Sequence, residues 1–330
     1  MAYPQFDRRC LRQIGGLLRL RMAQRFVKPR AYSPSYVRPG SGPNSAPNSG
    51  EDQPSNLITS KDNKWLKLFR AALRGTGPSG DELIGVEGPK LVEEAIRSGL
   101  ETHALLVSVT GEREMERILR TAAQSEAGIS RDRILKTSDK MFESVAGTET
   151  PQGVAALFRQ PVWDLDDLLR GDAPLVVVLA GIQDPGNLGT ILRSAEAFGA
   201  TGAVTTRGTA EPWSPKAIRA SAGSALRLPI VRGIAAPILL AQLKMHQIKV
   251  VAASSQPCKS SAGRPGDLRS ALRGPAALFI GAEGAGLPTE VQHAADMTIS
   301  IPMSETVESL NAAVAASLLL YEAARLRKEG

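Results

Sequence analysis

The sequence predicts an α/β protein with two folded domains, the second built on a parallel sheet. The chain has 330 residues, and its hydrophobic content of 42% can supply two cores. Aromatic residues make up only 4%, which fits α/β layers better than an aromatic-rich β-sandwich. From about residue 57 onward, short apolar runs alternate with segments of helical periodicity. These observations together indicate the fold class.

Residues 1–55 are predicted to be a disordered basic tail and linker, because the Arg-rich start is followed by a run of Pro, Gly, Ser and Asn. Of the 40 Lys and Arg and 33 Asp and Glu, nine basic residues and one acidic residue lie in 1–50, so the rest of the chain is nearly neutral. The net charge of +7 is therefore no argument that the folded part binds nucleic acid. The Arg-rich part fits an organellar transit peptide, an arm attracted to RNA phosphates, or an early start codon with translation beginning at Met22 or later.

Residues 56–160 are predicted to form a small α/β domain. In chain order, its predicted elements are a helix at 61–73, a strand at 83–88, a helix at 89–99, a strand at 103–108, a helix at 112–126 and a strand at 153–158. Pro89 stands where proline is tolerated, in the first turn of a helix. The stretch contains no constellation of catalytic side chains, so we predict a role in recognition.

Residues 161–330 are predicted to form the second domain, a parallel sheet flanked by helices. The predicted strands are 175–180, 202–206, 249–253, 276–281 and 297–301, and the predicted helices are 187–199, 214–225, 235–247 and 309–327. Ligands of such sheets bind beyond the carboxyl ends of the strands. Functional side chains are therefore expected in the segments that follow the strands.

Several function classes are disfavoured by composition. Cys10 and Cys258 lie far apart, so a disulfide framework is not expected and a reducing compartment is the default. The three histidines have no metal-ligand spacing, and we expect no metal site. The longest apolar runs, such as 175–180, are too short to span a bilayer.

The first informative segment, 179–200, leads from a buried strand through a glycine-rich turn into a helix. Asn187 is the predicted N-cap of this helix, and Arg193 lies further along it. An amide and a cation close together past the end of a strand are typical of a functional site. A plain cap with a solvent-facing arginine explains the same residues.

The second segment, 278–288, also runs from a strand into glycines, with Glu283 among Gly281, Gly284 and Gly286. Glycines let a ligand lie against the backbone and leave amides free to bind it. Their order is not the GxGxxG of a dinucleotide site, and the GK[ST] of a phosphate loop is absent. A nucleotide-dependent oxidoreductase is therefore disfavoured.

The third segment, 299–326, contains a strand that ends near Pro302 and a long apolar helix that Ser309, Leu310 and Asn311 open. Ser309 or Asn311 could serve simply as its cap. A helix that is apolar nearly all round must be buried, partly against something beyond its own sheet. A dimer interface is the simplest explanation.

The order and spacing of these segments resemble the SpoU/TrmH branch of the SPOUT RNA methyltransferases. The matching pieces are Asn187-x-Gly189-x-x-x-Arg193, Gly281-Ala282-Glu283-Gly284, and Ile301-Pro302-Met303 followed by Ser309-Leu310-Asn311. Residues 213–230 look like the family's linking segment. Residues 57–160 resemble the substrate-binding domain that often precedes it, which is similar to an RNA-binding fold of ribosomal proteins. The resemblance covers all of the chain except the tail.

The resemblance implies transfer of a methyl group from S-adenosylmethionine to a ribose 2′-OH of RNA. It implies a parallel-sheet SPOUT domain with a trefoil knot, an exception to the rule that chains do not thread. The backbone around Gly281, Gly284, Ile301 and Leu310 is expected to hold the methyl donor. A homodimer with its active site at the interface is also expected.

The resemblance further implies roles for individual side chains. Arg193 is expected to act as general base or as a charged stabiliser of the ribose oxygen, with Asn187, Glu283, Ser309 and Asn311 positioning substrate and donor. A guanidinium normally stays protonated in proteins, so a literal base role requires an unusual environment. Both roles of Arg193 stay open at this point.

The extra N-terminal domain favours structured ribosomal RNA, of the large subunit, as the substrate. A tRNA ribose 2′-O-methyltransferase is the alternative, and a non-catalytic RNA-binding protein on the same fold is a further one. The presence of Asn187, Arg193, Glu283 and Asn311 argues against the non-catalytic alternative. A cytoplasmic, bacterial protein is expected, or a mitochondrial one if the tail is a transit peptide.

Overall fold

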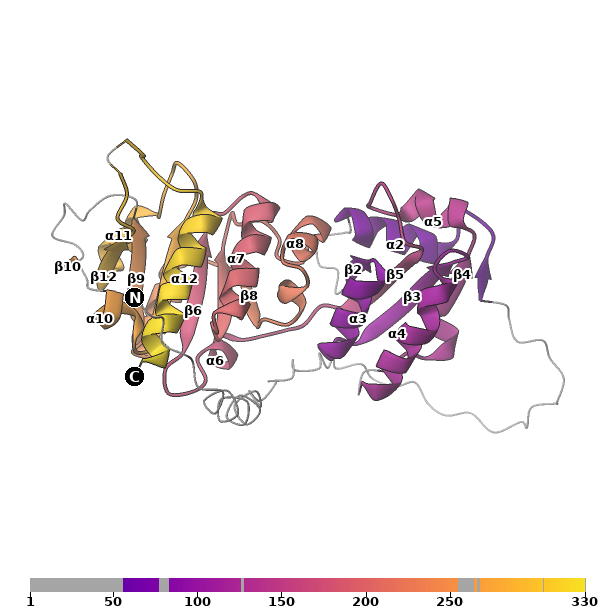
Figure 1. The fold of residues 1–330 in the computed structure, drawn as a ribbon, viewed down its shortest axis with the longest axis horizontal. Helices are drawn as coiled ribbons and strands as arrows, with labels where there is room; N and C mark the ends of the chain where they lie inside the picture. Colours follow the sequence, from indigo (N-terminus) through magenta and orange to yellow (C-terminus); the bar gives the residue numbers. More distant parts are fainter. Residues whose placement is uncertain are drawn as a thin grey trace, which may run out of the picture.

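The computed structural model describes residues 56–76, 83–125, 128–254, 264–265, 268–304 and 306–329. Two β-sheets organise this part of the chain, one before residue 160 and one after residue 174 (Figure 1). The predicted tail, with its three interpretations, lies outside the described residues. None of the helices in the described part combines the length and apolar character that crossing a bilayer requires.

The first sheet is mixed and has the strand order β1-β4-β3-β5-β2. Its elements are β1 (Leu57–Ile58), α2 (Lys64–Arg74), β2 (Leu83–Glu87), α3 (Pro89–Arg97), β3 (Thr102–Ser108), α4 (Glu112–Gln124), η1 (Arg131–Arg133), β4 (Ile134–Thr137), α5 (Asp139–Val145) and β5 (Val154–Arg159). Strands β1, β4 and β3 are parallel, and β5 is antiparallel to both of its neighbours. Successive side chains of a strand point to opposite faces. Accordingly, Ala104 and Leu106 of β3 join the core under α2 and α5, and Leu105 and Val107 join the core under α3 and α4.

The second sheet has the order β10-β12-β9-β11-β6-β7-β8, and all of its pairs are parallel. Its elements are α6 (Leu165–Leu168), β6 (Leu175–Ala180), α7 (Pro185–Ala197), β7 (Gly202–Thr206), α8 (Pro215–Ala220), η2 (Ser224–Leu226), β8 (Ile230–Ile234), α9 (Ala236–Met245), β9 (Lys249–Ser254), β10 (Arg264–Pro265), α10 (Leu268–Leu272), β11 (Ala276–Gly281), α11 (Thr289–Ala294), β12 (Met297–Ser300) and α12 (Ala312–Lys328). Strand β6 is buried at all six positions, as expected for a central parallel strand.

Helices cover both faces of the second sheet. Helices α6, α9 and α11 bury apolar residues on one face, and α7, α10 and α12 do so on the other. Figure 1 shows α12 lying beside α7 along the sheet. The strand order reverses between β6 and β11, because β7 and β8 extend to one side of β6 and the later strands extend to the other. A reversal of this kind leaves a crevice at the carboxyl ends of the strands.

The two sheets share one buried apolar cluster, which includes Val92 of α3 and Leu226 of η2. At this junction Arg227 donates a bidentate pair of hydrogen bonds to Glu196 of α7, at 2.6 and 2.8 Å, and a third to Glu94 of α3 at 2.7 Å. Arg227 thereby fixes the helix that carries the first motif against the preceding domain.

The predicted α/β class with a parallel second sheet is confirmed, whereas several element predictions were wrong or incomplete. The predicted helix at 214–225 is interrupted, because Ala222 and Gly223 take positive φ values of 49° and 86° between α8 and η2. The short strands β1, β4, β8 and β10 were missed, and β8 lies at the edge of the sheet with only one of its five residues buried. The trefoil knot and the domain boundaries at 55 and 160 stay predictions.

Candidate active site

The site forms where β6 and β11 end side by side. These central strands pair in parallel, and their last residues, Ala180 and Gly281, lie opposite each other. The turn into α7 therefore begins beside the glycine-rich loop that follows β11. Two motifs about a hundred residues apart in the sequence are neighbours because their strands are neighbours.

Asp184, not Asn187, is the N-cap of α7, so the predicted cap was wrong. The Asp184 carboxylate accepts the Asn187 amide hydrogen at 3.2 Å, and Pro185 occupies the first turn. An acid directly before a proline is itself a start signal for a helix, and it could have identified Asp184. Lys216 of α8 donates to the other carboxylate oxygen at 2.6 Å. This bond, together with the amides of Gly186 and Asn187, lowers the pKa of Asp184.

Because Asp184 caps the helix, the Asn187 side chain is free to reach the second motif. Asn187 Nδ2 donates to Glu283 Oε1 at 3.0 Å, and Asn311 Nδ2 donates to the same oxygen at 2.5 Å. The Ala312 amide donates a third hydrogen bond to it at 3.1 Å. Asn311 Nδ2 also lies 3.1 Å from Asn187 Oδ1. One carboxylate oxygen thus holds all three motifs together.

Asn311 has a second function as the N-cap of α12. Its Oδ1 accepts hydrogen bonds from the amides of Ala313 at 2.9 Å and Val314 at 3.2 Å. The predicted choice between Ser309 and Asn311 is therefore decided for Asn311. Its amide group uses the oxygen for the helix and the nitrogen for Glu283, so the start of α12 is fixed against the loop after β11.

Gly189, the glycine of the first motif, is required by packing. A Cβ atom added there would lie 2.5 Å from the Ala217 carbonyl oxygen and 2.7 Å from Ala220 Cβ. These distances leave no room for a side chain, so α7 and α8 touch through backbone at this point. The close approach places Lys216 within reach of Asp184.

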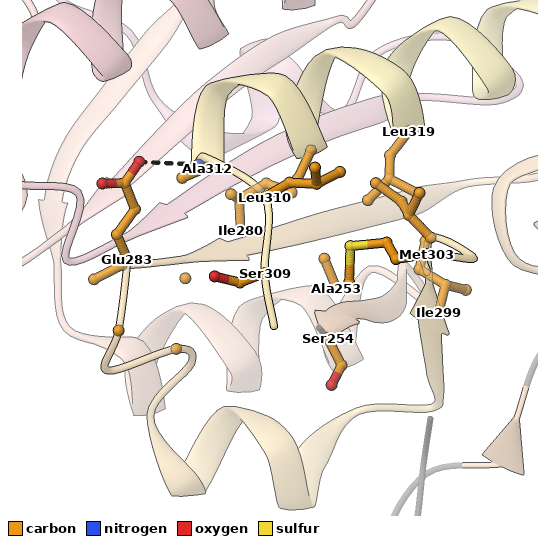
Figure 2. Close-up of a pocket in the computed structure, with 16 residues that line it drawn as sticks. Ala253, Ser254, Ile280, Glu283, Ile299, Met303, Ser309, Leu310, Ala312 and Leu319 are labelled. Carbon is orange, nitrogen blue, oxygen red and sulfur yellow. Dashed lines mark hydrogen bonds between the residues drawn. The ribbon is translucent and has the colours of Figure 1, made fainter. Parts of the chain in front are cut away.

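The three side chains of Asn187, Glu283 and Asn311 together form the Glu283 cluster. A pocket with a cavity volume of about 140 Å³ opens beside it. Its wall combines the backbone of the loop after β11 with the segment that precedes α12. The lining residues are Ala253, Ser254, Ile280, Gly281, Ala282, Glu283, Gly284, Gly286, Ile299, Ile301, Met303, Ser309, Leu310, Ala312, Ala315 and Leu319. Figure 2 shows Glu283 on one side of the pocket, with its carboxylate joined to Ala312, and Met303 and Leu319 on the other side.

The pocket suits a ligand with an apolar ring and a positive charge. Ile280, Ile299 and Leu319 supply an apolar wall, and the Glu283 carboxylate supplies negative charge at one side. A Cβ atom at Gly281 would lie 2.4 Å from the Gly286 carbonyl carbon, so the loop folds back closely over its own start. Gly281, Gly284 and Gly286 of this loop line the pocket, and residues without side chains let a ligand approach the backbone closely.

Arg193 does not join the Glu283 cluster. It lies six residues after Asn187 on α7, which separates the two by about 9 Å along the axis and by about a third of a turn around it. Its side chain is exposed and has no hydrogen bond or ion pair within the described residues. The neighbouring helix α12 packs against α7 through a hydrogen bond of 2.6 Å between the Ser194 and Ser317 hydroxyls.

Helix α12, which contacts α7 at the residue after Arg193, carries an exposed apolar stripe. Val314, Leu318 and Tyr321 are 49%, 46% and 55% exposed, and their spacing of four and three residues places them on one side of the helix. Tyr321 also contacts Phe198 of α7 edge-on, with ring centroids 5.7 Å apart. The predicted apolar helix is thus buried on its sheet side and uncovered on the other.

Of the nine residues predicted for the site, eight meet at the pocket or the Glu283 cluster. Gly281, Gly284, Ile301, Leu310, Ser309 and Glu283 line the pocket, and Asn311 joins Glu283 beside it. Asn187 reaches the cluster from α7, and Arg193 alone lies apart. The prediction missed Asp184 and Lys216. The described residues contain no group of three His, Cys, Asp or Glu side chains that could hold a metal ion.

Comparisons with known proteins match both parts of the chain. A model of the SpoU rRNA methylase family matches residues 174–321, and a model of the MRM3-like substrate-binding domain matches residues 80–156. The chain is 33% identical over 237 residues to the Bacillus subtilis 23S rRNA (guanosine(2553)-2′-O)-methyltransferase RlmP, covering 72% of this chain and 86% of the relative. It is 31% identical over 252 residues to the 23S rRNA (uridine(2479)-2′-O)-methyltransferase of Streptomyces viridochromogenes, covering 74% and 83%.

A solved structure matches the same extent of the chain. The AdoMet-bound rRNA methyltransferase from Sinorhizobium meliloti superposes with a TM-score of 0.68 at 29% identity. The match covers 82% of this chain and 97% of that one, so it includes both sheets. The overall fold described above therefore has a counterpart in a structure named as an AdoMet-bound rRNA methyltransferase.

Proposed function

The chain belongs to the SpoU rRNA methylase family, and we propose that it methylates ribose 2′-hydroxyl groups of large-subunit ribosomal RNA. Membership makes it an RNA 2′-O-methyltransferase that uses S-adenosylmethionine. The choice of ribosomal RNA over tRNA is supported by the two relatives named for 23S rRNA, which the chain matches across both of its domains. An enzyme with this substrate is expected in the cytoplasm.

The observation that carries the proposal is the convergence on Glu283. Asn187, Asn311 and the Ala312 amide all donate to one oxygen of this carboxylate, directly beside the pocket. Three hydrogen bonds to one exposed oxygen fix the loops that form the pocket wall. We therefore assign Glu283, Asn187 and Asn311 to positioning the site, because their polar atoms are engaged with each other.

The pocket lining fits S-adenosylmethionine, which supplies a methyl group bonded to a positively charged sulfur. Ile280, Ile299 and Leu319 would contact its apolar parts, and the Gly281–Gly286 backbone would donate to its polar atoms. The negative charge of Glu283 would attract the positive charge of the donor toward that side of the pocket. Ser309 and Leu310 would close the pocket from the α12 side.

Arg193 is proposed to act across a dimer interface. It lies on α7 beside the exposed stripe of Val314, Leu318 and Tyr321, so a second copy that covers the stripe also covers Arg193. In water-excluded surroundings a fixed positive charge stabilises a developing oxyanion strongly. Because guanidinium groups stay protonated in proteins, we propose that Arg193 stabilises the negative charge that develops on the ribose oxygen as the hydroxyl proton passes to a solvent base.

The trefoil knot is also part of the proposal. Strand β12 lies beyond β9, on the far side of the sheet centre, yet the chain returns from it to place α12 against α7. The chain between β12 and α12 therefore returns across the carboxyl ends of β9 and β11, where Ser254 and Gly281 line the pocket. A knot at this place would keep the pocket-forming loops together.

The function is tested by incubating the purified protein with deproteinised large-subunit rRNA and S-adenosylmethionine labelled in its methyl group. A 2′-O-methyl group protects the neighbouring phosphodiester bond from alkali, so label should appear in alkali-resistant dinucleotides. A tRNA sample in a parallel reaction tests the alternative substrate. Label in tRNA alone would contradict the choice of ribosomal RNA, and label released as methylated base would contradict the ribose assignment.

Arg193→Ala is expected to reduce methyl transfer at least a hundredfold while leaving donor binding within about twofold, because Arg193 does not line the pocket. Arg193→Lys, which keeps the charge, should recover part of the rate. The measurements are single-turnover methyl transfer and titration calorimetry with S-adenosylmethionine. Near-normal turnover by Arg193→Ala would remove Arg193 from the mechanism.

A further inference from the structure

Helix α2 presents an entirely basic exposed face. Lys64, Lys67, Arg70 and Arg74 recur at spacings of three, three and four residues, beside the side of the helix that buries Leu66, Phe69 and Leu73; Arg70 is half-buried and the other three cations are exposed. Over this span the four cations extend about 15 Å along the helix axis. The helix contains no acidic residue, whereas α3, α4 and α5 of the same domain each carry at least two.

The charges of this face are not neutralised by carboxylates. Arg70 and Arg74 each donate to the Ser144 carbonyl oxygen at 3.3 Å, a neutral acceptor that leaves their charge in place. Lys67 lies 3.5 Å from Asp62, but these side chains are 60% and 91% exposed, and such surface pairs are weak. Lys64 has no ion pair with any residue that the structure describes.

The basic face of α2 leads toward the active site through α8. Gly75 ends α2 in a left-handed conformation, and a Cβ atom on it would lie 3.5 Å from Pro215 Cδ at the start of α8. Figure 1 shows α8 between α7 and α2. On α8, Lys216 binds Asp184 at the start of α7, and Arg219 is exposed without an ion pair in the described part of the chain. Cations therefore continue from α2 onto the helix that contacts the first motif.

We propose that the basic face of α2, continued by Arg219, binds the phosphates of the RNA whose ribose reaches the pocket. This inference rests on the proposed function. Phosphates are the complement of a row of cations with at most weak carboxylate partners, and contacts to phosphates position a nucleic acid without reading its sequence. An anionic membrane surface is the less suitable partner, because a membrane-binding helix exposes apolar residues and those of α2 are buried.

The test compares neutralising substitutions on two helices that cover opposite faces of the first sheet. The variant Lys64→Gln with Lys67→Gln alters α2, and adding Arg219→Gln extends the change to α8. The matched control is Arg113→Gln with Arg120→Gln, two exposed cations of α4. Lys64 and Lys67 are chosen because, unlike Arg70 and Arg74, they hold no backbone carbonyl.

Binding of deproteinised large-subunit rRNA is measured at several KCl concentrations. Each lost phosphate contact should lower the slope of log affinity against log salt by about 0.7–0.9. The double variant should therefore lose about 1.5 from the slope and at least tenfold in affinity at about 0.1 M salt, and the triple variant should lose more. The α4 control should stay within about twofold of the unaltered protein.

A variant Lys64→Arg with Lys67→Arg separates charge from folding. It should bind RNA like the unaltered protein, and S-adenosylmethionine binding should be unchanged in every variant. Equal RNA affinity in the α2 and α4 variants would overturn the proposal, as would an equal loss in the charge-retaining variant. Binding to anionic vesicles without binding to RNA would overturn it as well. If the unaltered protein binds RNA through α2 but transfers no methyl group, the proposed function fails, and only the RNA-binding role of α2 stands.

Discussion

The Gly281→Ala substitution should weaken donor binding without unfolding the protein. Gly281 is the last residue of β11, and the loop after it folds back, with a hydrogen bond of 2.9 Å from the Gly286 amide to the Ala282 carbonyl. A Cβ atom at Gly281 would lie 2.4 Å from the Gly286 carbonyl carbon and 2.6 Å from the Leu287 nitrogen. Ordinary contact begins at 3.4 Å, so the loop must move by about 1 Å.

The cost of this movement follows from packing. Extra carbon atoms in a closely packed place cost about 1–3 kcal/mol. The displaced loop forms one wall of the pocket. If the donor binds only to the original loop geometry, the cost of restoring that geometry is subtracted from the free energy of donor binding. With about 1.4 kcal/mol per factor of ten, the dissociation constant of S-adenosylmethionine should rise about 5- to 150-fold.

The matched control is Gly274→Ala, at the opposite end of the same strand. A Cβ atom there has no heavy atom within 4 Å, and Gly274 is not among the residues with positive φ. Titration calorimetry with S-adenosylmethionine and a thermal unfolding curve are measured for both variants. If Gly281→Ala binds the donor as tightly as Gly274→Ala, the reasoning from the loop geometry is wrong.

Two further predictions concern the surfaces of α12 and of the domain junction. Leu318→Asp places a charge in the exposed stripe of α12 and should convert the proposed dimer to a monomer with little methyl transfer. Light scattering measures the oligomeric state, and a methyl-transfer assay measures the activity. An unaltered protein that is already monomeric would contradict the interface. Arg227→Ala should lower the free energy of unfolding at pH 7 by about 2 kcal/mol, because it leaves Glu196 and Glu94 without their shared partner at a site where Arg227 is 22% exposed. Burial acts to raise the pKa of Glu196, but the Arg227 hydrogen bonds outweigh it and the pKa lies below its ordinary 4.5. The stabilisation is thus present above about pH 4.5 and is lost as pH falls through the lowered pKa of Glu196. Arg227→Ala should therefore flatten the acid side of the curve of unfolding free energy against pH. If this curve has the same shape from pH 7 to 3 in Arg227→Ala and in the unaltered protein, the lowered pKa of Glu196 is not due to Arg227.

The sequence could predict the pocket because strand ends determine it. Glycines and polar residues that follow β6 and β11 come together once those strands are central and parallel, and their apolar runs showed both properties. The predicted Asn187 cap failed for a local reason, since the Asp-Pro pair one turn earlier is the stronger start signal. Correcting the cap explains how the Asn187 side chain is free to bind Glu283.

Other features could not be predicted because they depend on contacts between distant segments. Arg227 and Glu94 are 133 positions apart, and nothing in either local sequence marks them as partners. Edge strands such as β8 are half exposed and lack the apolar run that identifies a buried strand. The break between α8 and η2 depends on a positive φ at Ala222, a conformation that alanine rarely adopts and that tertiary packing must impose.

The position of Arg193 apart from the Glu283 cluster supports the proposal that one chain holds only part of the site. The cluster of Asn187, Glu283 and Asn311 is complete within the chain, since each side chain has partners there. Arg193 stands about 9 Å further along α7, beside a stripe of exposed apolar side chains that water alone would not favour. A single association that buries the stripe would also desolvate the guanidinium and strengthen its effect on a nearby oxyanion. The proposed interface therefore accounts both for an arginine without a partner among the described residues and for an uncovered helix face. In the proposed dimer, methyl transfer should require association of the two copies, whereas donor binding should not.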